Sequence, residues 1–176
     1  LQATIFIFDY RGYGKSAGIP NEAGVISDGI AAQQWLANRL QLETSDLVLM
    51  GRSLGGGVAT AMAAQQGARA LILVSTFGRL VDVAATHYRW LPVRLLMCNR
   101  YNSIARIQRY KGPLIQSHGT ADQIVPIEIG RQLFDAAPTS NKVFYELEKY
   151  GHNDNPPASF YQNLAEFLAG NTFHRT

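Results

Sequence analysis

Cysteine is almost absent from this sequence, and long apolar runs are missing altogether. The single Cys98 cannot form a disulfide within the chain, which excludes a disulfide-framework module and a cysteine-rich zinc site. This count fits a reducing, cytoplasmic compartment, and we expect the thiol to be buried. No apolar run approaches the roughly 18 residues that span a bilayer, so we expect no membrane-crossing segment.

Strong net charge is also absent, since 16 Lys and Arg stand against 13 Asp and Glu. An excess of +3 is too small to indicate nucleic-acid binding. The charges are unevenly spread, however, because no acidic residue occurs between Asp82 and Asp122, where six basic residues fall: Arg89, Arg94, Arg100, Arg106, Arg109 and Lys111. This surface is either an ordinary solvated face or a site for anionic head groups, with peripheral membrane contact.

The 176 residues, 47% of them hydrophobic, are typical of one domain that covers 1–176. Short β-rich runs alternate with stretches of helical spacing. We expect strands at 5–8, 47–50, 70–74, 113–116 and 142–147, and helices over 22–40, 54–66, 127–136 and 158–169. This alternation predicts an α/β fold, with a mostly parallel sheet covered by helices on both faces.

The stretch at about 77–109 does not follow that rhythm. It is longer than a usual connection and combines the basic residues with an apolar group: Trp90, Leu91, Val93, Leu95, Leu96 and Met97. Two interpretations stand equally: a small lid that covers an acyl chain, or a plain helical crossover of the sheet.

Gly51-Arg52-Ser53-Leu54-Gly55 lies between a predicted strand and a predicted helix. A nucleophile at such a turn has strained backbone, and glycines two positions before and after it remove side chains that would collide. Ser53 is therefore the candidate nucleophile. Leu54, the first helical residue, is the candidate oxyanion-hole residue, because its backbone N–H points toward the substrate at the positive end of the helix dipole.

A serine hydroxyl needs an imidazole base and a carboxylate that orients the base. Asp122 follows the fourth predicted strand and His152 follows the fifth, so the order Ser53, Asp122, His152 supplies a catalytic triad. Asp154 is a weaker acid candidate. The other histidines are set aside because of their positions: His118 beside the acid, His87 within 77–109 and His174 near the C-terminus.

These motifs together resemble the α/β-hydrolase superfamily. Phe8 to Ser16 looks like the segment after that fold's fourth strand, 51–56 like its nucleophile elbow, and the Asp122 and His152 loops like its acid and base loops. The chain is most similar to small-lid serine hydrolases, which include esterase-like proteins and protein depalmitoylases. The resemblance implies hydrolysis of acyl esters or thioesters without a cofactor or metal, on a small-molecule or lipid-like acyl substrate.

The resemblance also implies an N-terminally incomplete fold, since the chain opens at what would be the fourth strand. The family's third strand lies between the fourth and fifth and leads to the second oxyanion-hole donor. Without it, residues 5–8 would stand two strand spacings, about 9.6 Å, from their nearest partner. We therefore expect the chain alone to aggregate, or to move 5–8 against the strand before Ser53.

The sequence offers three alternatives to an ester hydrolase. A serine peptidase-like hydrolase stays open, and so does a non-catalytic binding scaffold or inactive fragment. A phosphate-binding loop at Gly14-Lys15-Ser16 fails, because the pattern requires glycine five positions before Gly14, where Asp9 stands.

Overall fold

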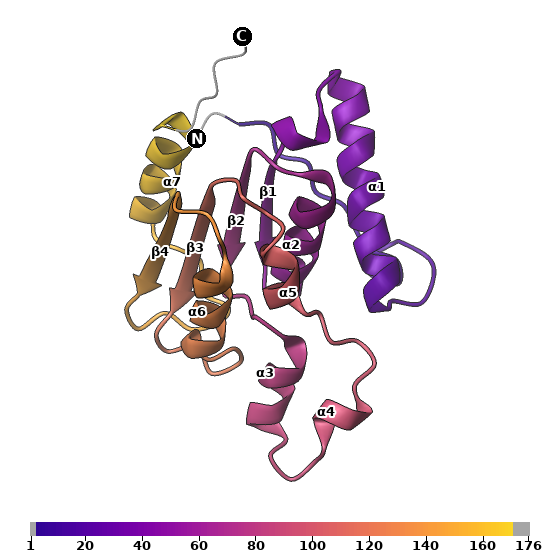
Figure 1. The fold of residues 1–176 in the computed structure, drawn as a ribbon, viewed down its shortest axis with the longest axis vertical. Helices are drawn as coiled ribbons and strands as arrows, with labels where there is room; N and C mark the ends of the chain where they lie inside the picture. The colour runs from indigo at the N-terminus through magenta and orange to yellow at the C-terminus, as the bar shows by residue number, and fades with distance from the viewer. Residues whose placement is uncertain (1–2, 171–176) are drawn as a thin grey trace.

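In the computed structural model, which describes residues 3–170, a parallel sheet lies between two layers of helices (Figure 1). Its strands are β1 (Val48–Arg52), β2 (Ala70–Val74), β3 (Leu114–Gly119) and β4 (Lys142–Leu147). They are hydrogen-bonded in the order β1-β2-β3-β4, and every pairing is parallel. The predicted α/β class is confirmed, and four of the five expected strands are present at the expected places.

The helices cover both faces of the sheet, as predicted. On one side lie α2 (Leu54–Gln66) and α6 (Ile127–Ala136), with α1 (Glu22–Leu40) packed outside α2; on the other side lies α7 (Ala158–Gly170). A short 3₁₀ helix (Thr44–Asp46) precedes β1. The alternation along β2 divides the core, because Leu71 and Leu73 join the α2 side while Ile72 packs with Phe160 of α7.

Residues 5–8 do not form the expected strand, and they pair neither with β1 nor with any other strand of the described residues. Ile5 and Ile7 are 78% and 83% exposed, and the ring of Phe6 stacks on Trp35 of α1 at 5.2 Å between centroids. A β-rich run becomes a strand only where a neighbour accepts and donates its backbone hydrogen bonds. The prediction was wrong because it used local propensity without a partner.

The glycine-containing loop at 9–18 is tied to α1. Arg11 forms a two-pronged ion pair with Asp28, with Nη2 2.7 Å from Oδ1 and Nε 2.9 Å from Oδ2, and its backbone N–H also donates to Oδ2. Asn21 begins α1 by accepting the Gly24 N–H at 2.8 Å. The loop and the helix start are therefore fixed relative to each other.

The 77–109 segment contains α3 (Leu80–His87), α4 (Val93–Leu96) and α5 (Ser103–Ile107). We call residues 80–100 the arm: α3 and α4 project beyond the carboxyl ends of the strands, whereas α5 returns to pack against α2 (Figure 1). The carboxylate of Glu22 fixes the return by accepting the N–H groups of Arg100 and Tyr101, at 2.7 and 3.0 Å, and the Arg106 guanidinium.

Cys98 is exposed, which corrects the expectation of a buried thiol. It follows α4 on the projecting arm, where no core lies over it. Composition alone favoured burial because free cysteines are usually buried, but the arm's path decided the matter.

Candidate active site

Ser53 stands at a sharp turn between β1 and α2. Its backbone has φ 50° and ψ −119°, a left-handed region that non-glycine residues rarely adopt. Its N–H donates to the carbonyl of Val74, and its own carbonyl accepts the hydroxyl of Thr76 at 2.8 Å. The end of β2 therefore holds the strained turn in place.

The glycines around this turn differ in their need for a missing side chain. A Cβ on Gly51 would collide with the backbone of Gly55, and one on Gly56 would collide with Thr76. A Cβ on Gly55 would meet only the Tyr10 hydroxyl, at 3.7 Å, an ordinary contact. The positions that require glycine are therefore 51 and 56, whereas sequence reasoning placed the second one at 55.

The structure brings Ser53, Asp122 and His152 together from the carboxyl ends of three strands. His152 Nε2 lies 3.0 Å from Ser53 Oγ, and His152 Nδ1 lies 2.8 Å from Asp122 Oδ2. The Asp122 side chain is fully buried and that of His152 is 9% exposed. This arrangement can pass a proton from the hydroxyl to the imidazole while the carboxylate fixes the ring.

The Asp122 carboxylate is held by its own loop. Its Oδ1 accepts the N–H groups of Ile124 and Val125 at 2.9 and 2.8 Å. His118 is completely buried beside it, with Nε2 2.8 Å from the carbonyl of Val125 and 3.2 Å from Asp122 Oδ2. Burial lowers the pKa of His118, although the contacts with Val125 and Asp122 oppose that shift. We therefore assign a neutral ring with its proton on Nε2, facing both acceptors.

The remaining candidates from the sequence take other places. Asp154 accepts the Gly151 N–H at 2.7 Å and so orders the turn that carries His152. His87, at the end of α3, contacts the carbonyl of Ile124 through Nε2 at 2.8 Å. His174 lies outside the described residues. Leu54 is the first residue of α2, so its backbone N–H is one that the helix itself leaves unpaired.

Arg52 is a site residue that sequence reasoning missed. Its guanidinium Nη2 donates to the backbone carbonyl of His152 and to that of Asp154 at 3.2 Å. The residue before the nucleophile thus holds the loop that carries the imidazole. The sequence places Arg52 directly before Ser53, but no pattern in the sequence indicates which loop the Arg52 side chain contacts.

Two further observations concern metal ligands and membrane-spanning helices. No group of three or more His, Cys, Asp or Glu side chains among residues 3–170 is arranged to hold a metal ion. No helix within the same residues is both long and apolar enough to cross a membrane.

Comparison with known proteins agrees with this fold. A family model of the α/β hydrolase fold matches residues 1–101. An uncharacterized protein of Mycobacterium tuberculosis is 39% identical over 154 residues, which cover 88% of this chain and 54% of that protein. The lysophosphatidylserine lipase ABHD12 of Danio rerio is 32% identical over 157 residues, covering 79% of this chain and 41% of the lipase. The chain belongs to the α/β-hydrolase family.

A solved structure shows the same fold. An esterase from Pyrococcus furiosus superposes with a TM-score of 0.72 at 18% identity, covering 92% of this chain and 68% of that one. The chain spans about half the length of the two curated relatives above.

Proposed function

We propose that this chain carries the catalytic site of a serine hydrolase that cleaves acyl ester or thioester bonds. The observation that carries the proposal is the hydrogen-bonded series Ser53 Oγ, His152 Nε2, His152 Nδ1 and Asp122 Oδ2. The lipase and esterase names of two similar proteins add support for the reaction class.

The reaction begins when Ser53 Oγ attacks the acyl carbonyl and His152 Nε2 takes the hydroxyl proton. Asp122 keeps the proton of Nδ1 in place and stabilises the imidazolium that forms. The tetrahedral intermediate collapses to an acyl-enzyme as His152 returns the proton to the departing alcohol or thiol. Water, activated by the same imidazole, then releases the carboxylic acid and restores Ser53.

The N–H of Leu54 is the proposed donor to the oxyanion. It lies at the start of the 13-residue helix α2, where unpaired N–H groups and the helix dipole favour negative charge. Because Ser53 immediately precedes it, the donor and the nucleophile share one turn. Thr76 and Val74 hold that turn before any substrate binds.

The proposed substrate has a hydrophobic acyl chain, and the arm supplies apolar surface for it. Trp90 and Leu95 are each 81% exposed and Leu96 is 60% exposed. All three belong to the arm, which projects beyond the carboxyl ends of the strands (Figure 1), and Ser53 directly follows β1 at that edge. Exposed tryptophan and leucine beside arginines also suit a lipid surface, because the rings enter the interface while the guanidinium groups meet anionic head groups. We therefore include peripheral membrane contact in the proposal.

The test replaces Ser53 with Ala in the full-length protein and follows hydrolysis of nitrophenyl esters from acetyl to octanoyl. We expect kcat to fall by roughly 10⁴ to 10⁶ while the circular dichroism spectrum stays unchanged. A fluorophosphonate probe should label the parent protein and not the variant. Hydrolysis retained by a folded Ser53→Ala protein would exclude the nucleophile. Cleavage of a peptide amide in preference to the esters would favour a peptidase. If the probe does not label the parent protein, the result would favour a binding scaffold.

A further inference from the structure

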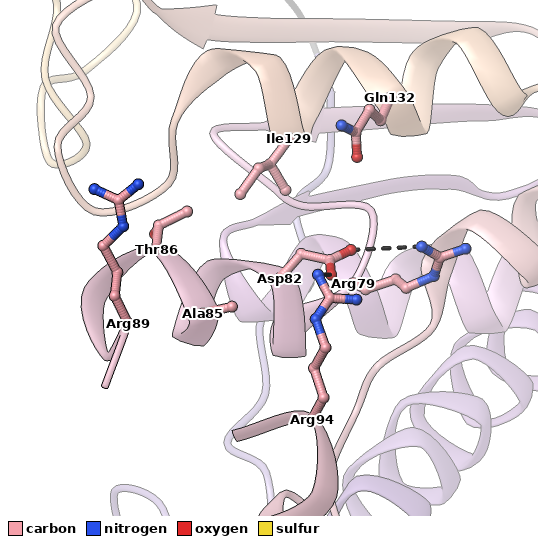
Figure 2. Close-up of a pocket in the computed structure, with 8 residues that line it drawn as sticks. All are labelled: Arg79, Asp82, Ala85, Thr86, Arg89, Arg94, Ile129 and Gln132. Atoms are coloured by element: carbon pink, nitrogen blue, oxygen red, sulfur yellow. Dashed lines mark ion pairs between the residues drawn. The ribbon is translucent and has the colours of Figure 1, made fainter. Parts of the chain in front are cut away.

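A cavity of about 660 Å³ opens between the arm and α6 (Figure 2). From the α3 side it is lined by Arg79, Asp82, Ala85, Thr86 and Arg89; Arg94 of α4 and Ile129 and Gln132 of α6 complete it. The volume falls within the range of small-molecule sites. Within α3, Ala85 and Thr86 lie three and four residues after Asp82, so one face of this helix is turned to α6.

Positive charge dominates the lining, which has three guanidinium groups against one carboxylate. Asp82 is 14% exposed and binds two of the three, with Oδ1 2.9 Å from Arg94 Nη2 and Oδ2 3.5 Å from Arg79 Nη1. Arg89 has no ion-pair partner within residues 3–170. Two of the guanidinium charges are therefore not balanced by the pocket itself.

The Asp82 carboxylate positions Arg79 and Arg94 through its ion pairs. Each guanidinium carries five N–H donors, and the ion pairs with Asp82 place Arg79 and Arg94 at the cavity with donors left for a ligand. Thr86 and Gln132 add hydrogen-bonding groups, and Ala85 and Ile129 add a small apolar wall. Guanidinium groups prefer ligands with several anionic oxygens, which a phosphate ester provides.

The cavity lies beyond the same edge of the sheet as the candidate active site. The arm extends from the carboxyl ends of the strands, the edge at which Ser53 stands (Figure 1). At the end of α3, the ring of His87 contacts the carbonyl of Ile124, in the loop that holds Asp122. A ligand bound between α3 and α6 would therefore lie on the same side of the sheet as the nucleophile.

We propose that this cavity, with Arg89 and Arg94 as its main cationic groups, binds a phosphate monoester or diester. The group is either the head group of the acyl substrate, a case that rests on the proposed function, or a free organic phosphate. The two sources share one chemistry and are separated by the experiments below.

The first experiment measures binding without catalysis. In full-length protein with Ser53→Ala, glycerol 3-phosphate should bind by isothermal titration calorimetry, and glycerol should not. Adding Arg89→Gln and Arg94→Gln should raise the dissociation constant of glycerol 3-phosphate by about tenfold or more. The control variant carries Arg109→Gln and Lys111→Gln, which remove the same two charges from exposed positions outside the cavity. Arg94 is paired with Asp82, so its loss could disturb the fold. The single variant Arg89→Gln leaves this ion pair intact and should also weaken glycerol 3-phosphate binding.

The second experiment identifies the source. Protein with Ser53 intact is assayed on 1-octanoylglycerol 3-phosphate and on 1-octanoylglycerol. If the phosphate is the head group, Arg89→Gln/Arg94→Gln lowers the kcat/KM ratio of the first to the second at least about tenfold. An unchanged ratio together with weakened glycerol 3-phosphate binding assigns the site to a free phosphate.

The proposal is overturned if glycerol 3-phosphate does not bind, or if the control variant weakens glycerol 3-phosphate binding as much as Arg89→Gln/Arg94→Gln does. Failure of Ser53→Ala to abolish hydrolysis would remove the proposed function and leave the binding result standing.

Discussion

His118 Nε2 lies 3.2 Å from Asp122 Oδ2, the same oxygen that is 2.8 Å from His152 Nδ1. One carboxylate oxygen therefore faces two imidazoles, while the other oxygen accepts two backbone N–H groups. The buried ring of His118 closes the side of Asp122 away from His152. It leaves the carboxylate one orientation, the orientation that holds His152 toward Ser53.

The burial of His118 predicts a loss of stability in mild acid. Because burial lowers its pKa below the ordinary value near 6.5, the unfolded chain binds a proton at a pH where the folded protein does not. The contribution is complete above about pH 6.5 and is lost as pH falls toward the folded-state pKa, by up to about 1.4 kcal/mol per pH unit. Urea unfolding between pH 7.5 and 5 measures it. His118→Gln should flatten this slope, and an unchanged slope would contradict the assignment.

The two glycines of the pentapeptide should respond differently to alanine. Gly51→Ala drives a Cβ into the backbone of Gly55 and should lower the free energy of unfolding by about 2–3 kcal/mol. Gly55→Ala meets only the Tyr10 hydroxyl and replaces a helical glycine, so stability should be unchanged or raised by up to about 1 kcal/mol. Denaturant unfolding of Gly51→Ala and Gly55→Ala measures both effects. Equal losses of unfolding free energy in the two variants would contradict the described turn.

Arg52 should act as a positioning residue for His152. Arg52→Met removes its hydrogen bonds to the carbonyls of His152 and Asp154, and we expect kcat for a nitrophenyl ester to fall about tenfold to hundredfold through misplacement of the imidazole. KM should change little. Added guanidinium ion should restore part of kcat in this variant and none in Ser53→Ala. A large change in KM without one in kcat would place Arg52 in substrate binding instead.

The arm should contribute to lipid-surface contact. Leu95 on α4 and Ile19 in the loop before α1 are 81% and 82% exposed, so they form a matched pair. Leu95→Ser should reduce co-sedimentation with phosphatidylglycerol vesicles several-fold, whereas Ile19→Ser should not. Phosphatidylcholine vesicles should bind the parent protein more weakly, because they lack net charge for the arginines. Equal effects of the two substitutions would assign any vesicle binding to another surface.

Several features could be predicted because their signals are local. The apolar periodic stretch over 22–40 forms α1, and β2 spans 70–74, both as expected. A run of buried β-formers between turns has few other stable states. The candidates Ser53, Asp122 and His152 could be chosen because each follows a strand, and parallel strands end at one edge. Their catalytic roles remain predictions.

The sequence by itself determined the alternation of strands and helices, the turn at Ser53 and the order of the candidate residues, since neighbouring side chains and backbone preferences govern these. Tertiary structure alone decided that 5–8 would form no strand, with Phe6 stacked on Trp35, and that Cys98 would be exposed. It also decided that Arg52 would reach the loop of His152 and that His118 would press against Asp122. These outcomes depend on partners distant in the chain, whose positions are set only when the sheet and helices pack together.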